Sequence, residues 1–298
     1  MASLRQIRQR IKSIQSSKQI MRAMQLVSAS KLKRTQDKLV QGRGVMEFLD
    51  GLLQRVLAAT TPQEGSRAPS ATPQPPLCRV PDHAAASTLV IVSSDAGLCG
   101  SYNTNVIQLA EAHLRRDSAK TTQVVFIGKR AYRYFTKRGY AATEAYLDLA
   151  GRPNPAKAEA IGRALIERFL SGSTGSVSVL SSRFVSPSVY RPAIQSWLPI
   201  QLSTQRNAPS SPPLDYIFEP SPEQVFEDLL PRWAVAKFQL MLLEAFTSEH
   251  SARMIAMKNA TDNAEELLNA LTRQRNRIRQ AAITKELSEI VGTAEALK

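Results

Sequence analysis

The chain has 298 residues and carries 39 Lys and Arg against 25 Asp and Glu, a formal net charge of +14. A hydrophobic content of 43% is enough for a packed core of one large domain or two modest ones, and an aromatic content of 6% favours long helices over an all-β body. No apolar run reaches transmembrane length, and two cysteines are too few for a disulfide framework, so we expect a reducing compartment. The positive charge predicts an acidic partner, which is a nucleic acid, an anionic membrane surface or an acidic protein surface.

Residues 1–59 are predicted to form a coiled-coil helix. Positions at alternating steps of three and four residues follow the a/d register of a heptad. The stripe consists of Leu4, Ile7, Ile11, Ile14, Lys18, Met21, Gln25, Ser28, Leu32, Thr35, Leu39, Gly42, Met46, Leu49, Leu53 and Val56. Its outer parts are mostly apolar and its centre is polar, so the pattern fits either an ordinary bundle helix or a shaft that also faces a third surface.

Residues 60–82 are rich in proline and predict a solvent-exposed linker or loop, partly in polyproline II conformation. Linkers of this composition outnumber true SH3-domain ligands, so we favour the linker interpretation. Cys78 lies in this stretch and is expected to be an exposed thiol without a role.

Residues 83–206 predict an α/β domain of Rossmann-like type. Short apolar runs at 87–95 and 123–128 are typical of buried strands, and an amphipathic helix separates them. The order strand, helix, strand indicates a βαβ unit and therefore a parallel sheet. Two further strands on either side of Ser186 and Pro187 predict a hairpin.

Residues 221–298 are predicted to form a second long helix, capped near Ser221 and entered through Pro222. One apolar stripe contains Met257, Ala264, Leu268, Leu271, Ile278 and Ala282, and a stripe displaced by about one residue continues through Leu287, Ile290, Ala294 and Leu297. The segment 238–246 is apolar around most of its circumference and should be enclosed. The predicted fold class is therefore α/β, with a long antiparallel coiled coil of the two terminal helices and an inserted Rossmann-like domain.

The turn Gly97-Leu-Cys-Gly100 after the first strand is the strongest candidate for chemistry in the α/β domain. It has neither the G-x-G-x-x-G of a dinucleotide site nor the G-K-[ST] of a P-loop, although it fits the GxxG of a KH RNA-binding loop. We interpret it as a tight strand-to-helix turn, with Asp95 as a cap rather than a catalyst. Cys99 has no histidine near it in sequence, so a nucleophilic role is not favoured.

The remaining polar residues define no catalytic, cofactor or metal site. Histidines occur singly, without metal-ligand spacing, at His83, His113 and His250. The alternating arginines Arg273, Arg275, Arg277 and Arg279 present charge in several directions around a helix. Such a run fits a rod among acidic surfaces, or simply a solvated helix.

Three stretches of the sequence resemble the gamma subunit of F-type ATP synthases. They are LRQIRQRIKSIQSSKQIMRAMQLVSASKLKRTQ at 4–36, SSDAGLCGSYNTNV at 93–106, and the C-terminal set EPSPEQVFEDLLPR, SEHSARMIAMKNATDNAEELL and RQAAITKELSEIVGTAEAL. The three stretches occur in the family's order along the whole chain. The sequence departs from the family's usual pattern at Gln25, Ala96 and Ser101 and in the irregular proline-rich stretch 61–81, which affects expectations for the surface of the α/β domain.

The resemblance implies a non-catalytic rotor without a cofactor. Its terminal helices would thread a ring of three alpha and three beta subunits, and its α/β domain would sit on the epsilon subunit and the membrane ring of c subunits. Proton flow would turn the c ring and the shaft, and the asymmetric shaft would change the nucleotide affinities of the beta subunits in turn. The chain would then lie peripherally on the cytoplasmic face of a bacterial inner membrane.

The resemblance also implies positions of contact between rotor and stator. Met24 and Arg253 match positions where the shaft meets the beta subunits. Arg279, Gln280 and Thr284 match positions that contact acidic loops around the upper shaft.

Two alternatives remain open from the sequence. A basic RNA- or ribosome-binding protein would also use long basic helices and a GxxG turn. A nucleotide-dependent enzyme built on the α/β domain ranks last, because the sequence has no phosphate-loop motif.

Overall fold

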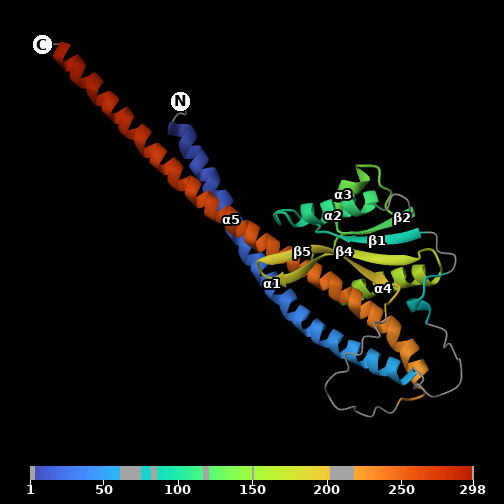
Figure 1. The fold of residues 1–298 in the computed structure, drawn as a ribbon. Helices are drawn as coiled ribbons and strands as arrows, with labels where there is room; N and C mark the ends of the chain where they lie inside the picture. Colours follow the sequence, from blue (N-terminus) through green and yellow to red (C-terminus); the bar gives the residue numbers. More distant parts are fainter. Residues whose placement is uncertain are drawn as a thin grey trace. The chain divides into compact units, whose positions relative to one another are not determined.

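The chain has a long helix at each end of the sequence and an α/β domain between them in sequence (Figure 1). The computed structural model describes residues 4–60, 75–81, 86–116, 121–149, 151–201 and 218–296. The helices are α1 (Leu4–Thr60), a 3₁₀ helix η1 (Pro76–Cys78), α2 (Tyr102–Arg116), α3 (Lys129–Thr136), α4 (Pro155–Leu170) and α5 (Pro222–Ala296). The strands are β1 (Ala86–Val92), β2 (Thr121–Ile127), β3 (Glu144–Tyr146), β4 (Ser176–Ser186) and β5 (Val189–Leu198).

The residues group into two compact units, which are described separately. The helical unit consists of Met1–Ser30 and Arg253–Lys298, and the α/β unit consists of Lys31–Ala252.

The heptad stripe predicted for α1 is confirmed by its burial. Every position from Leu4 to Val56 in that stripe is buried or half-buried, including the polar ones. Ser28 and Thr35 are each 3% exposed. The hydroxyl of Thr35 donates to the carbonyl oxygens of Lys31 and Leu32, at 3.1 and 3.0 Å, so its burial leaves no unmet hydrogen bond. At Thr35 the polar position of the stripe is therefore satisfied within α1 itself, by the backbone of the preceding turn.

The sheet of the α/β unit has the strand order β3-β2-β1-β4-β5. β1 pairs in parallel with β2 and with β4, and β2 pairs in parallel with β3, while β4 and β5 are antiparallel. The predicted βαβ unit and the predicted hairpin at Ser186 and Pro187 are both confirmed. The order 3-2-1-4 places the reversal of winding between β1 and β4.

Both faces of the sheet are covered, as the continuous apolar strands require. Alternate residues of β1 face opposite ways: Leu89 and Ile91 pack with α2 and α3, and Val90 and Val92 pack with α1, α4 and α5. Figure 1 shows α2 and α3 on one face of the sheet and α4 on the other. The larger of the two cores includes residues from α1, α4 and α5.

The short edge strand β3 was not predicted, because three residues carry too little pattern. It pairs in parallel with β2, and hydrogen bonds to the carboxylate of Glu144 add to this pairing. Arg168 of α4 donates to the carboxylate of Glu144 at 2.7 Å, and the hydroxyl of Tyr146 also donates to that carboxylate. Burial raises the pKa of Glu144, but these two hydrogen bonds outweigh it and leave the pKa below its ordinary value. Burial and the neighbouring carboxylate raise the pKa of Tyr146 to about 12.

Helix α5 begins at Pro222, as predicted. The backbone N–H of Gln224 donates to the hydroxyl of Ser221 at 3.3 Å, and Pro222 occupies the first helical position, where a missing N–H costs nothing. The segment 238–246 is enclosed as predicted, with Phe238 and Ala245 fully buried.

The prediction of an exposed thiol at Cys78 is wrong. Leu77 is 4% exposed and packs in the larger core, and its carbonyl accepts a hydrogen bond from the N–H of Ile200 at 2.8 Å. Cys78 is half-buried as a result, and burial raises the pKa of its thiol to about 11. Most of the proline-rich stretch, residues 61–74, lies outside the described residues.

In the helical unit, the predicted stripe of α5 is covered over only part of its length. Met257 and Ala264 are buried, and the ammonium of Lys18 pairs with the carboxylate of Glu265 at 3.2 Å. Further along the stripe, Leu268, Leu271 and Ile278 are half-buried. The next members, Ala282, Leu287, Ile290 and Ala294, are exposed, and Leu297 lies outside the described residues. The displaced stripe of the C-terminal turns is therefore uncovered within this unit as far as residue 294.

Candidate interaction surfaces

The C-terminal turns of α5 present an exposed apolar face. All residues from 279 to 294 are exposed. Ile283, Leu287, Ile290 and Val291 are 49%, 57%, 63% and 60% exposed. Steps of four, three and one residues place them on one side of a helix. An apolar face of this kind marks a surface that another molecule covers.

The five predicted contact residues differ in their accessibility. Arg279, Gln280 and Thr284 are exposed at the beginning of this face, where the hydroxyl of Thr284 donates to the carbonyl oxygen of Gln280 at 3.0 Å. Met24 is half-buried on α1, and Arg253 is only 8% exposed on α5. Three of the five residues therefore share one open surface, and Arg253 offers a partner little of its side chain.

The alternating arginines lie on the turns before this face. Arg273, Arg277 and Arg279 are exposed, and Arg275 is half-buried with its guanidinium on the amide oxygen of Asn276 at 3.2 and 3.4 Å. Their positive charge is therefore available to an acidic partner on more than one side of the helix.

In the α/β unit, residues 233–251 of α5 hold the surrounding elements together, and we call them the anchor segment. Trp197 of β5 donates its indole N–H to the carbonyl of Ala234 at 3.0 Å, and its ring lies 4.9 Å from that of Phe238. Trp233 donates to the carboxylate of Asp50 in α1 at 2.6 Å. Trp197 is buried and Trp233 is half-buried, and the N–H group of each indole is satisfied.

Polar side chains at the C-terminal end of the anchor segment reach several neighbours. Glu244 accepts a 2.6 Å bond from the guanidinium of Arg43 in α1. Ser248 donates to the carbonyl of Ser182 in β4 at 3.0 Å, and Nε2 of His250 lies 2.8 Å from the carbonyl oxygen of Gly151.

Two more contacts involve the hairpin and α2: Ser251 donates to the carbonyl of Pro187 in the hairpin, and Tyr102 of α2 donates to the carbonyl of Ala245 at 3.2 Å. A force applied to α5 here is shared among α1, α2 and the β4–β5 hairpin.

The Gly97–Gly100 turn is a structural turn, as predicted. Leu98 and Gly100 have φ angles of 62° and 56°, which tighten the chain between β1 and α2. Gly97 lies against the guanidinium of Arg130, which a Cβ would approach to 2.4 Å. Asp95 accepts the backbone N–H of Lys129 at 2.9 Å, so it caps the start of α3 and its predicted role as a cap is confirmed.

The crevice at the carboxyl ends of β1 and β4 is filled by protein. Dinucleotides bind at this switch point in doubly wound sheets. Here Tyr102 is 1% exposed and packs with Cys99 and with Ala252 of α5, and its ring lies 6.2 Å from that of Tyr190. The nucleotide-enzyme alternative therefore gains no support from the geometry.

The other residues considered as candidates for chemistry have structural partners or lie outside the described part of the chain. Cys99 is 2% exposed and its sulfur accepts a bond from the amide of Asn103 at 3.0 Å. His250 belongs to the anchor segment, His113 lies half-buried on α2, and His83 falls outside the described residues. Among the described residues, no group of three His, Cys, Asp or Glu side chains is placed to hold a metal ion. None of the helices that the structure describes is long and apolar enough to cross a membrane.

Comparison with known proteins gives these surfaces a context. A family model described as ATP synthase matches residues 3–297. The chain is 38% identical over 298 residues to the ATP synthase gamma chain of Desulforamulus reducens, covering 100% of both chains. It is 37% identical over 292 residues to that of Symbiobacterium thermophilum, covering 98% of this chain and 97% of the relative.

The chain belongs to the ATP synthase gamma chain family. The relatives named above support the gamma-subunit interpretation of the sequence and give no support to an RNA- or ribosome-binding protein.

Solved structures of ATP synthases contain the same fold. A chain of the Euglena gracilis mitochondrial ATP synthase, from a structure of its OSCP, F1 and c-ring in rotational state 3, aligns with a TM-score of 0.67. The alignment covers 99% of this chain and 94% of the other, at 17% identity. A chain from the rotor of the same synthase in rotational state 1 aligns with a TM-score of 0.63 over 94% and 98%, at 16% identity. The fold is therefore that of a chain found in the rotor of the Euglena gracilis synthase.

Sequence reasoning missed the anchor segment as a functional feature. Glu244 lies within an apolar run and binds Arg43 of α1, and the carbonyl partners of Ser248 and Ser251 in β4 and the hairpin leave no trace in sequence. A buried glutamate in a helix that is otherwise apolar was the available signal, because a buried charge needs a partner.

Proposed function

We propose that this gamma chain is the rotating shaft of an F-type ATP synthase and is not itself catalytic. It would turn within a ring of three alpha and three beta subunits, and its asymmetric surface would set the three catalytic sites to different nucleotide affinities. A ligand or a partner shifts a conformational equilibrium only through contacts that differ between the states. A rotating shaft would present a different contact surface to each catalytic site in turn.

The exposed apolar face of residues 283–291 carries this proposal. Four aliphatic side chains about half exposed on the final turns of a helix favour a partner that surrounds the helix. Smooth aliphatic groups form no directional bonds, so a helix that carries them can rotate in an apolar sleeve without breaking hydrogen bonds. The polar contacts then lie at the beginning of the sleeve, at Arg279, Gln280 and Thr284.

We propose specific roles for the predicted contact residues. Arg279, Gln280 and Thr284 would meet acidic loops of the surrounding subunits, supported by their exposure and by the positive charge of the preceding arginines. Met24 and Arg253 would lie at the level of the beta subunits. The low exposure of Arg253 implies that a partner touches only a small part of this residue.

The proposed partners of the α/β unit are the epsilon subunit and the ring of c subunits. Through them the chain would be held peripherally at the cytoplasmic face of the bacterial inner membrane. The bacterial origin of the relatives supports this location.

Reconstitution tests the proposal. The full-length chain is mixed with alpha and beta subunits, complexes are isolated, and their subunit ratio and rate of ATP hydrolysis are measured. We expect one copy per three alpha–beta pairs. Replacing Ile283, Leu287 and Ile290 together by aspartate should prevent assembly or sharply reduce hydrolysis, because three carboxylates would enter an apolar sleeve.

A matched control places the same substitution on the exposed surface of the α/β unit, at Leu170 and Val185, which are 49% and 59% exposed. This variant should assemble and hydrolyse ATP normally with alpha and beta subunits alone. If the chain forms no complex and instead binds RNA with a steep dependence on salt, the rotor proposal fails.

A further inference from the structure

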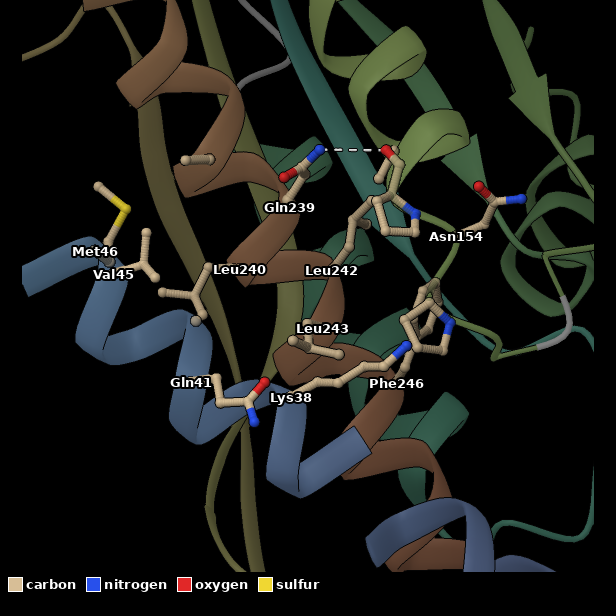
Figure 2. A pocket seen from close by; sticks show the side chains of 15 residues that line it. Lys38, Gln41, Val45, Met46, Asn154, Gln239, Leu240, Leu242, Leu243 and Phe246 are labelled. Atoms are coloured by element: carbon tan, nitrogen blue, oxygen red, sulfur yellow. Dashed lines mark hydrogen bonds between the residues drawn. The ribbon is translucent and has the colours of Figure 1, made fainter. Parts of the chain in front are cut away.

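A cavity in the α/β unit lies between the two long helices and the start of α4. Its volume is about 320 Å³. Its walls come from residues 38–46 of α1, 236–246 of α5 and 153–158 around the beginning of α4. Figure 2 shows the lining side chains, with Leu240, Leu242 and Leu243 of α5 opposite Val45 and Met46 of α1.

The walls are held in place without a ligand. The ion pair between Arg43 and Glu244 ties α1 to α5 beside the cavity at 2.6 Å. The amide of Gln239 donates to the carbonyl of Pro155 at 3.2 Å and ties α5 to α4 (Figure 2). Met46, Leu242 and Phe246 line it and are buried. Filling a preformed cavity costs little ordering entropy.

One of the residues that line the cavity, Gly42, has no side chain. A Cβ at Gly42 would lie 3.2 Å from Cδ1 of Leu240, so a larger side chain here would enter the space between the helices. A Cβ at Gly44, two residues further along α1, would have no other atom within 4 Å. A side chain at Gly42 would therefore narrow the cavity, and one at Gly44 would not.

The side chains that line the cavity suit a ligand with a hydrocarbon body and a negative charge at one end. The walls are predominantly aliphatic and aromatic carbon, which favours a hydrocarbon body. Lys38 lines one side, is exposed, and makes no hydrogen bond or ion pair with any residue that the structure describes. Figure 2 shows its side chain reaching from α1 across the cavity toward Phe246. An unpaired ammonium beside apolar walls suits a ligand with a carboxylate at one end.

We propose that this cavity binds medium-chain carboxylates, with the hydrocarbon chain between α1 and α5 and the carboxylate on Lys38. The volume of the cavity limits the length of the hydrocarbon chain that fits in it. A methylene group is about as large as a water molecule, which occupies about 30 Å³ in the liquid, so the cavity holds on the order of ten carbons. The size lies at the lower end of ligand pockets, which begin near 300 Å³. The proposal is independent of the rotor function.

Titration of the full-length chain with the carboxylates from hexanoate to tetradecanoate, each below its micelle concentration, tests the proposal by calorimetry. Burying one methylene is worth about 0.8 kcal/mol, so Kd should fall about fourfold per added carbon. The fall should stop near ten carbons, when the cavity is full. A Kd that keeps falling to tetradecanoate would show general adsorption and overturn the proposal.

Variants separate the cavity from the surface. Gly42→Leu should reduce decanoate binding at least tenfold, and Gly44→Leu, its control in the same helix, should leave it unchanged. If Gly42→Leu does not fold, the Lys38→Ala variant still tests whether the carboxylate binds Lys38. It should weaken decanoate two- to fivefold, the range of an exposed ion pair, and leave 1-decanol unaffected. Lys12→Ala, an exposed lysine elsewhere on α1, should change neither.

The assembled complex gives the last arm of the test. Decanoate should bind the chain equally well alone and with its alpha, beta and epsilon subunits. Binding that disappears on assembly would assign the cavity to a protein contact, and equal effects of the Gly42 and Gly44 variants would assign the binding to another place; either result overturns the proposal.

Discussion

Replacing Arg43 by methionine tests whether the anchor segment is held by charge as well as by apolar packing. Methionine keeps most of the aliphatic stem and removes the guanidinium, so packing changes little. The guanidinium donates to the carboxylate of Glu244 at 2.6 Å and to the carbonyl of Phe184 at 3.0 Å. The substitution therefore removes the donor that the Glu244 carboxylate in α5 and the Phe184 carbonyl in β4 share.

The expected loss of stability follows from the exposure of the pair. The Glu244 side chain is 10% exposed and that of Arg43 is 40% exposed. Removing one partner of a fully buried pair costs about 3–5 kcal/mol, and an exposed pair contributes about 0.2–1 kcal/mol. This pair lies between those limits because water reaches the guanidinium but hardly reaches the carboxylate. We expect Arg43→Met to lower the free energy of unfolding by about 2 kcal/mol.

Urea unfolding followed by tryptophan fluorescence measures this cost. The chain has two tryptophans, and both Trp197 and Trp233 lie in the α/β unit, so their emission reports the unfolding of that unit. A double-mutant cycle with Glu244→Gln should give a coupling free energy of about 1 kcal/mol or more. A cost below about 0.5 kcal/mol together with zero coupling would refute the reasoning and leave apolar packing as the source of the anchor's stability.

Three further predictions concern the α/β unit. Gly128→Ala should destabilise it by about 3 kcal/mol or more in the same urea assay, since φ is +99° and a Cβ would lie 2.0 Å from the carbonyl oxygen of Ser93; a loss below about 1 kcal/mol would contradict this. Glu144→Gln should be less stable than the parent at pH 7. Because the folded pKa of Glu144 is lowered, that difference should shrink as the pH falls below its ordinary value of 4.5, and a difference independent of pH would count against the hydrogen-bonded carboxylate. Cys78, with the other cysteine replaced by serine, should react with iodoacetamide at pH 8 about tenfold more slowly than a thiol of pKa 9.0, because its pKa of about 11 leaves less thiolate and the greater nucleophilicity of that thiolate only partly offsets the loss; equal rates would show that the thiol is exposed.

The elements with strong periodicity could be predicted from the sequence. The heptad stripe of α1 and the apolar runs of β1 and β2 are local signals, since burial on one face repeats every 3.5 residues in a coiled coil and continuous apolar runs mark a strand covered on both sides. The start of α5 at Pro222 could also be predicted, because Ser221 and Pro222 have preferred places in a helix N-terminus.

Features made by distant residues could not be predicted. β3 pairs with β2, and Arg168 of the distant helix α4 holds Glu144 at its first residue. Cys78 is half-buried because the backbone of Ile200 binds the residue before it. In both cases the decisive partner lies far along the chain and carries no pattern of its own.

The candidate contact surface, too, could be predicted from the sequence only in part. The apolar residues of the final turns of α5 could be predicted as one helical face, yet whether the chain covers them itself depends on where α1 begins. Motif resemblance supplied the positions Arg279, Gln280 and Thr284, and the structure adds that they are accessible. Their contacts with other subunits remain a prediction.

The larger core of the α/β unit has a consequence for biosynthesis. It joins Val56 near the start of the chain to Phe246 near its end, so 190 residues must be translated between the two (246 minus 56). At about 5–20 residues per second, the ribosome needs roughly 10–40 s for that stretch. During this interval the apolar stripe of the first helix has emerged without the helix that will cover it. The nascent chain must therefore be shielded by chaperones or remain helical and unpaired, and synonymous codons that slow the middle of the message should lower the yield of folded protein.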